Sequence, residues 1–437
     1  MATLLTEKKA EDSLSVRRIM SLGLQHVLVM YAGTVTVPLI LASVMGLNST
    51  QTVTLVNACL LTSGLATLLQ SIGVGRFGGR LPLIQGCSFI MLAPMALIGQ
   101  QYGMATLFGS AIACGLFTLL VAPLFSRLIR FFPPLVTGCI ITIIGISLMP
   151  AAAIWMGGGN PDAPDFASLP HLLLGAATLV ITLFFYCKTR GIVRNFSILA
   201  GMLAGTLIAF IAGLTDFSAV GQAAWIGFTL PFAFGLPEFS AVPVLVSCLA
   251  MIIVMTETTG NVLLIDKLMG HPTTSQRLAN TLRADGLSTM IGGCLNSFPY
   301  NAFSQNAGLL MLTRITSRSV LAAAGLILVL LGLFPMLGAI ISAIPRPVLG
   351  GAAILMFGMT LAAGIQQLKE VSFSDDNTLL IVAVSVGVGV IPVAFPALFS
   401  TLPPSLKLIF DSGIFLGGFT AVLLNILLNS RKGEKDA

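Results

Sequence analysis

The stretch VPVLVSCLAMIIVMT, residues 242–256, contains fifteen residues without a charged side chain, and Glu257 follows it directly. A helix of about 20 apolar residues is long enough to cross the hydrocarbon core of a bilayer. Similar runs recur along the chain, and only 9% of its 437 residues are charged, whereas soluble domains carry about 25%. The composition therefore predicts an all-α polytopic membrane protein.

We expect fourteen membrane segments joined by short loops, with polar tails at 1–19 and 430–437. The segments cover residues 20–43, 51–73, 82–99, 103–123, 132–153, 170–187, 195–214, 240–266, 279–294, 298–313, 319–342, 346–366, 378–399 and 407–429.

The basic residues give this topology an orientation. With the N-terminus in the cytoplasm, every one of the 22 lysines and arginines except Arg346 and Lys407 lies in a cytoplasmic loop or tail. Lys and Arg are enriched on the cytoplasmic side of membrane proteins. Both termini are therefore expected in the cytoplasm. Since topology accounts for the net charge of +6, we expect no nucleic-acid partner.

A faint internal repeat connects the two halves of the chain. Pro134 and Gly138 of the fifth segment recur 213 residues later, as Pro347 and Gly351 of the twelfth. The repeating unit is seven segments, and because seven is odd the second copy must be inverted in the membrane. We predict repeats over 20–214 and 240–429. Inverted repeats are typical of secondary transporters with one central site.

Two segments are broken by proline and glycine. The third, 81–99, contains Pro82, Gly86 and Pro94, and the tenth, 296–314, contains Pro299 and Gly308. Short, interrupted segments at matching places in two repeats indicate a transport site. Unwound backbone is tolerated at membrane depth only where protein or a wet cavity satisfies its polar groups.

Glu257 is the acidic residue that stands out. A carboxylate deep in a span costs about 2.5 kcal/mol or more on insertion scales, and it indicates a functional site. A carboxyl that gains and loses a proton is what proton-coupled transport requires. The structural alternative is an ion pair or a polar packing residue.

Three more polar residues lie within apolar segments. Asp285 lies about one turn into the ninth segment, where Arg283 or a neighbouring helix could pair with it. Asn261 follows Glu257 by four residues and shares its helical face. His26 is expected to be neutral and hydrogen-bonded. Since the three histidines are scattered along the chain, no metal site is expected.

The carboxamides of Gln305 and Asn306 offer donors and acceptors side by side. Such groups suit a planar ring that alternates N–H and C=O, and Glu257 could accept from its N–H groups. Phe89, beside the broken third segment, could stack on the ring; ordinary packing is the alternative for this residue.

These residues resemble the nucleobase–ascorbate transporter family. Its signature is matched in full by Gln305, Asn306, Gly308, Thr313 and Arg314. Four further motifs resemble those of the family in the right order: LQHVLVMYAG (24–33), LIQGCSF (83–89), TETTGN (256–261) and RADG (283–286). The resemblance covers nearly the whole chain.

The resemblance implies a fold and a mode of action. Fourteen spans form two inverted repeats of seven, with a core domain from the first four spans of each repeat and a gate domain from the last three. The third and tenth spans each contain a short β-strand followed by a helix, and substrate binds between them. Members are usually homodimers, and bacterial ones are usually proton symporters of the cytoplasmic membrane.

The resemblance also implies roles for individual residues. Glu257 and Gln305 match the two substrate-binding side chains; Ser88, Phe89 and Ser304 match positions that line the ring; Asn306, Asp285 and His26 match positions tied to binding geometry and coupling. Asn261 departs from the Asp found in several xanthine and urate carriers. This departure removes a possible charge from the coupling site, and it leaves the choice between xanthine and urate as substrate undecided.

Gln305 resembles the purine members that take xanthine or urate, whereas uracil carriers tend to have Glu there. The expectation is therefore a proton-coupled symporter for an oxidised purine, with lipid as its surroundings and without a cofactor. A uracil carrier on the same fold is the first alternative, and an anion transporter of the same architecture is the second. We expect no enzyme, because no nucleophile–base pair or cofactor motif occurs.

Overall fold

The computed structural model describes most of the chain. The described residues are 15–127, 133–190, 194, 197–215, 220–221, 224–303, 306, 310, 315–369, 371–373, 375–403, 406–407, 410–411 and 413–429. Within them, eight helices are long and apolar enough to cross a membrane, and three shorter apolar helices accompany them. The prediction of a helical, multi-pass membrane protein is thus supported by the structure, and the count of fourteen segments stays a prediction.

The helices and strands follow in this order along the chain: α2 (Val16–Val44), α3 (Ser49–Ile72), β1 (Gln85–Cys87), η1 (Phe89–Met91), α4 (Leu92–Phe125), α5 (Pro134–Met156), α6 (Leu169–Lys188), α8 (Ser197–Ile211), α10 (Ala241–Leu268), α11 (Ser275–Cys294), β2 (Tyr300–Ala302), α13 (Arg318–Gly332), α14 (Pro335–Ser342), α15 (Arg346–Leu368), α16 (Asp376–Ala394), η3 (Pro396–Phe399) and α18 (Gly413–Asn429).

Local sequence explains where several helices begin. Asn48 caps α3 by accepting a hydrogen bond from the Gln51 backbone, and the Gln51 side chain accepts one from the Asn48 N–H in return. Thr274 caps α11 in the same way through the Arg277 N–H. α5 and α15 both carry a proline in their first turn, where the missing N–H has no intrahelical partner to lose.

The boundary predicted between the third and fourth segments coincides with a break in α4, whose two helical parts meet at Gly103 with a non-helical φ of 84° and ψ of 173°. The predicted segment 319–342 is two helices, α13 and α14. Pro335 opens α14, and proline cannot continue a helix from the preceding turn.

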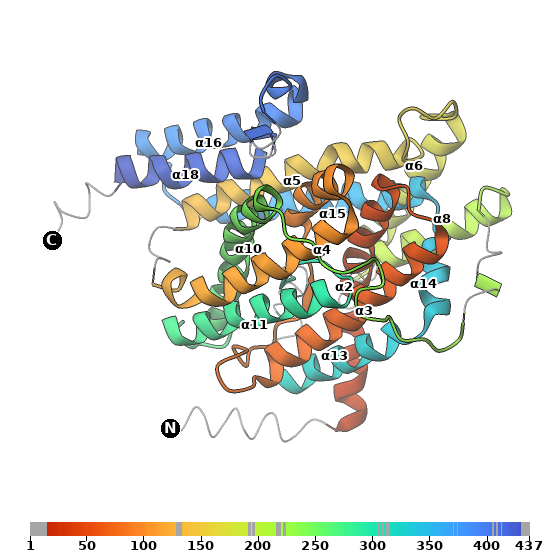
Figure 1. Ribbon diagram of the computed structural model, residues 1–437, viewed down its shortest axis with the longest axis horizontal. Coiled ribbons are helices and arrows are strands. Elements are labelled where there is room, and N and C mark those ends of the chain that lie inside the picture. Colours follow the sequence, from red (N-terminus) through yellow and green to blue (C-terminus); the bar gives the residue numbers. More distant parts are fainter. Residues whose placement is uncertain are drawn as a thin grey trace.

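The helices pack in two groups (Figure 1). In the first group, α13 packs on α2 and α3, while α11 packs on α3 and α4, and α10 on α4. In the second group, α15 packs on α5, α6 and α8, while α16 and α18 pack on each other and on α5. α16 and α18 lie side by side at one edge of the molecule, far from α13 at the other (Figure 1).

Glycines allow the helices of the first group to cross closely. A methyl group on Gly64 of α3 would lie 2.6 Å from the Gly325 oxygen of α13. Likewise, a methyl group on Gly286 of α11 would lie 2.7 Å from the Gly115 oxygen of α4. Close backbone approach at small residues is how helices associate within a membrane.

In the second group, α5 and α15 run antiparallel. A methyl group on Gly145 would lie 2.5 Å from the Leu361 nitrogen, and one on Gly364 would lie 2.4 Å from the Thr142 nitrogen. As the residue number rises on α5 it falls on α15, so the two helices have opposite directions.

The strands β1 and β2 form a buried antiparallel pair inside the first group. Their register pairs Gln85 with Ala302, Gly86 with Asn301, and Cys87 with Tyr300. The two strands come from the segments that the sequence indicated as broken. They contact α2, α3, α10 and α11, so helices surround them.

Candidate functional site

The polar face of α10 covers the free edge of β2. The Ala302 N–H donates to Thr258 Oγ1 at 3.4 Å, and the Asn261 side chain donates to the Ala302 oxygen at 2.9 Å. An extended backbone inside a membrane must have its polar groups satisfied by protein or by water. Thr258 and Asn261 therefore satisfy the Ala302 N–H and oxygen, which a third strand would otherwise pair.

Glu257 precedes this pair on the same helix and approaches the strand through a side chain. Its Oε2 accepts a hydrogen bond from Asn301 Nδ2 at 2.5 Å. Glu257 is half-buried and Asn301 is buried. A hydrogen bond to a carboxylate is shorter and stronger than one between neutral groups. The structure thus places the predicted carboxyl at the edge of the strand pair.

Asp285 lies fully buried on α11 and is linked to α10 through Thr258. Its Oδ2 accepts from the Thr258 hydroxyl at 2.7 Å, and its Oδ1 accepts from Gln70 of α3 at 3.2 Å. Of the two partners that the sequence left open, the structure shows neighbouring helices, α10 and α3, while Arg283 donates to Asn280. A buried carboxyl with neutral donors on both oxygens can exist in either protonation state at moderate cost.

His26 of α2 meets Asn306, which belongs to the tenth segment. Asn306 Nδ2 lies 3.0 Å from the His26 backbone oxygen and 3.1 Å from its Nδ1. A backbone oxygen can only accept, so the amide nitrogen must face His26, and Nδ1 must accept as well. The predicted hydrogen bonding of His26 is thus present in the structure, and an Nδ1 that accepts agrees with the predicted neutral imidazole.

Phe89 and Ser88 lie where β1 passes into η1. The Phe89 ring is 6.2 Å from the Phe303 ring and 5.6 Å from the Phe357 ring, between ring centres. Phe357 belongs to α15, so this aromatic contact joins the two helix groups. The Ser88 hydroxyl is buried and has no hydrogen-bond partner among the described residues, which leaves it able to bond a ligand.

The structure brings some of the predicted site residues together, and others lie outside the described residues. Glu257 and Asn261 contact β2 directly, Asp285 is linked to it through Thr258, and His26 contacts Asn306. Ser304 and Gln305 lie outside the described residues. Their roles stay predictions.

Three residues of this site were missed by sequence reasoning: Asn301, Thr258 and Gln70. Each hydrogen-bonds a carboxyl that comes from a different element. Asn301 matches Ser88 at the repeat offset of 213 residues, and that match was the available signal for a role at the strand pair. Thr258 and Gln70 carry no such signal.

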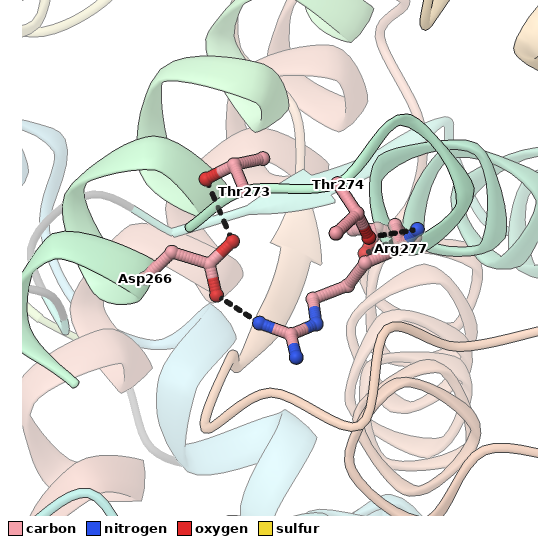
Figure 2. Close-up of polar contacts among 5 residues, drawn as sticks. Asp266, Thr273, Thr274 and Arg277 are labelled. Atoms are coloured by element: carbon pink, nitrogen blue, oxygen red, sulfur yellow. Dashed lines mark hydrogen bonds and ion pairs between the residues drawn. The ribbon is translucent and has the colours of Figure 1, made fainter. Parts of the chain in front are cut away.

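A second polar cluster lies at the turn between α10 and α11 (Figure 2). Asp266, at the end of α10, is fully buried and pairs with Arg277 at 2.5 Å. The Thr273 hydroxyl donates to the other carboxylate oxygen at 2.7 Å, while Thr274 caps α11 beside it (Figure 2). The pair fixes the turn that follows the Glu257 helix.

Comparison with known proteins finds similarity over nearly the whole chain. A family model described as "Permease family" matches residues 17–398. The xanthine permease of Bacillus subtilis is 43% identical over 424 residues, which cover 96% of this chain and 97% of that one. The uric acid permease PucJ of the same organism is 40% identical over 418 residues, covering 95% and 93%. The uric acid transporter UacT of Escherichia coli is 40% identical over 427 residues, covering 97% and 88%.

Solved structures resemble the fold at low identity. The transmembrane domain of the cyanobacterium bicarbonate transporter BicA matches with a TM-score of 0.59 and 16% identity, over 94% of this chain and 98% of that one. The murine anion transporter Slc26a9 in its inward-facing state matches with a TM-score of 0.64 and 13% identity, over 96% and 69%. At these identities the likeness concerns the fold alone.

Proposed function

The chain belongs to the nucleobase–ascorbate transporter family of permeases, and from this membership we propose that it is a proton-coupled symporter that imports an oxidised purine. The substrate is xanthine, uric acid or both. The observation that carries the proposal is Glu257, a carboxyl within a long apolar helix, which the strand pair meets through Asn301.

The proposed substrate agrees with the chemistry around the strands. Xanthine and uric acid carry several ring N–H groups and carbonyl groups in one plane. The Glu257 carboxylate accepts from ring N–H groups, and the Ser88 hydroxyl supplies a further polar contact. Gln305 reads the remaining edge of the purine, with Ser304 beside it, and Phe89 packs against the ring. Relatives at 40–43% identity are named as xanthine and uric acid permeases.

Proton coupling is proposed for Glu257. Its neighbour Asp285 bonds the next residue of α10, Thr258, so protonation at one carboxyl is felt at the other. Asn261 replaces a possible third charge on this face with a neutral amide that holds β2. His26, neutral and bound to Asn306, sets the geometry of the segment that follows β2. The mechanism uses a proton as coupling ion and no cofactor.

The proposed architecture has fourteen segments in two inverted repeats, 20–214 and 240–429. Two features support it. The matched helices α5 and α15 run antiparallel, as mates of an inverted repeat must. Cys87 and Tyr300, which lie 213 residues apart, pair with each other across the strands, so the axis relating the repeats passes between them.

Transport then proceeds by alternating access between the two helix groups. The group of α2, α3, α4, α10, α11 and α13 is the core, and the group of α5, α6, α8, α15, α16 and α18 is the gate. Phe89 of the core contacts Phe357 of the gate, which supports a site on the boundary between them. Motion of core against gate exposes the site to each side in turn.

The proposal includes the setting of the molecule. It is a homodimer in the bacterial cytoplasmic membrane, surrounded by lipid, with both termini in the cytoplasm. Solved structures of similar fold include an anion transporter, but Glu257 offers an acceptor for ring N–H groups where a site for a small anion would need donors or a cation, which favours the purine over that alternative.

The test is uptake of labelled xanthine into cells that lack their own purine permeases and express this chain. Excess unlabelled uric acid or uracil serves as competitor, with and without a protonophore. Uptake that the protonophore and uric acid block, and that uracil leaves unchanged, supports the proposal. Competition by uracil alone would assign the chain to the pyrimidine branch and overturn the substrate proposal.

A further inference from the structure

Asn301 is held in β2 by contacts on either side of it. The Tyr300 N–H donates to Thr289 Oγ1 at 3.1 Å, and the Ala302 oxygen accepts from Asn261 at 2.9 Å. The Tyr300 hydroxyl lies 2.6 Å from Ser297 Oγ and also contacts Thr62. Successive side chains of a strand point to opposite faces, so Asn301 points away from this cluster and toward α10.

We propose that Asn301 is a positioning residue for Glu257 that serves both protonation states of its carboxyl; this inference rests on the function proposed above for Glu257. An asparagine amide has N–H donors at one end and an acceptor oxygen at the other. When Glu257 is ionised, Nδ2 donates to Oε2, as observed at 2.5 Å. When Glu257 is protonated, the amide rotates by half a turn and its oxygen accepts from the new O–H.

The surroundings of α10 explain why a neutral partner matters. The elements packed against it are α4, α5, α11, α18, β2 and η1. Of these, α11 alone contains Asp, Glu, His, Lys or Arg side chains within the described residues.

Asp285 is the α11 carboxyl linked to α10, through Thr258, the residue next to Glu257, whereas Arg277 pairs with Asp266 and Arg283 donates to Asn280. A cation beside Glu257 would hold it ionised throughout the cycle. A carboxamide stabilises the ionised form without preventing protonation. It also orients the carboxylate, because one oxygen is committed to the strand.

Two isosteric variants separate this role from a purely structural one. Asn301→Leu removes both the donor and the acceptor, and Asn301→Asp keeps the shape but places a second carboxyl beside the first. In the purified full chain, infrared difference spectroscopy follows the carboxyl band of Glu257 as the pH changes. The band is assigned by its loss in Glu257→Gln, made in each background.

In Asn301→Leu, the pH at which half of the Glu257 band is lost should rise by about one unit, because the ionised form loses a charge-assisted hydrogen bond that is stronger than the neutral bond lost by the protonated form. In Asn301→Asp it should rise further, because two close carboxyls share one proton. Thr289→Val is the matched control. This variant on α11 removes the acceptor of the Tyr300 N–H, which belongs to the same strand as Asn301, and it does not alter a contact of Glu257. The pH midpoint of the Glu257 band should therefore equal that of the parent.

An unchanged midpoint in both Asn301 variants overturns the proposal, whether or not the chain carries a purine, because this readout involves no substrate. A shift of the same size in Thr289→Val also overturns it, since the effect would then come from a general disturbance of β2. Failure of the proposed function would give a different result. The parent chain would then take up no purine, while the midpoint shifts of the Asn301 variants would remain.

Discussion

Glu257 shows how one residue can carry most of a functional argument. Its carboxyl lies within α10, a helix of 28 residues, where a charged side chain costs about 2.5 kcal/mol or more. The structure offsets part of this cost with a 2.5 Å hydrogen bond from Asn301. That bond is worth about 1.5–3 kcal/mol when the acceptor is charged. The hydrogen bond therefore lowers the cost of an ionised carboxyl at this depth without supplying a fixed positive charge.

Glu257→Gln should abolish concentrative uptake. Glutamine has nearly the same shape and keeps an acceptor oxygen, but it cannot bind and release a proton. Losing a bond to a charged group weakens purine binding by about 10- to 100-fold, and accumulation against a gradient should be lost entirely. Labelled xanthine uptake with and without a protonophore measures both effects.

The control for that variant is Glu238→Gln. Glu238 lies in the loop before α10, is exposed, and bonds Thr106, so the same chemical change there should leave uptake intact. If Glu257→Gln still concentrates xanthine and a protonophore still prevents it, then Glu257 is not the coupling carboxyl.

Sequence reasoning reached some of these residues and not others for a physical reason. Glu257 was predictable because one charge in a long apolar run is conspicuous in the sequence itself. Asn301 was not, because its importance comes from a partner 44 residues away and from a strand of only three residues. Gln70 and Thr258 are common polar residues whose roles appear only when α3, α10 and α11 are placed together.

At the scale of elements, a charge pair between Asp266 and Arg277 holds the turn between α10 and α11. Asp266 is fully buried while the Arg277 side chain is 32% exposed, and Figure 2 shows the pair beside the Thr273 and Thr274 side chains. The same end of the molecule receives the loop after α3, because the Gly78 N–H donates to the Asn280 oxygen at 2.9 Å.

Arg277→Gln should destabilise the chain by about 3 kcal/mol, because it leaves a buried carboxylate without its cation. The double variant Asp266→Asn with Arg277→Gln should recover most of the loss, since no buried charge then remains. Thermal unfolding of the detergent-solubilised protein, followed by size-exclusion chromatography after heating, measures both. Equal losses in the single and double variants would contradict the role of the charge pair.

Gly64→Leu should prevent correct folding. The added side chain would meet the Val329 nitrogen at 2.5 Å and the Gly325 oxygen at 2.6 Å, and overpacking of this kind costs about 1–3 kcal/mol or more. Gly387→Leu on α16 is the matched control, because nothing lies within 4 Å of the position where its side chain begins. The yield of monodisperse protein compares the two, and equal yields would show that the crossing of α3 and α13 adapts.

The ends of helices differ in how well the sequence predicts them. The range predicted for the eighth segment, 240–266, is close to α10, Ala241–Leu268, because charges and loops delimit it on both sides. Gly103 was predicted to lie at a segment boundary, and the two helical parts of α4 do meet there at a kink. A glycine can end a helix or only bend it, and the neighbouring helices decide which occurs.

At the scale of the whole molecule, the constant offset of 213 residues connects sequence to shape. It was read from prolines and glycines of α5 and α15, yet it also applies to Cys87 and Tyr300, which pair across the strands. Unrelated segments would have no reason to share one offset. The proposed inverted repeats explain both facts, and they require the equivalent ends of two matched helices to face opposite sides of the membrane.

The orientation of the molecule can be tested at the two ends of α3. Thr50 in its first turn and Val74 just beyond its last are both exposed, and the bias of Lys and Arg places Thr50 outside and Val74 in the cytoplasm. In a Cys187→Ser background, which removes the exposed native thiol, a membrane-impermeant maleimide should label Thr50→Cys in intact cells. Val74→Cys should react only after the membrane is opened.

The reverse pattern would invert the whole molecule, because no helix of the chain can be reoriented alone while α3 keeps its crossing with α13 and its contacts with α11. Labelling of both positions in intact cells would instead show that α3 does not span the membrane. The expected pattern has a consequence for the site. The Asp266–Arg277 turn, which shares its end of the molecule with the loop after Val74, then lies on the cytoplasmic side, so the helix carrying Glu257 is anchored at the face toward which the proposed importer would release its substrate.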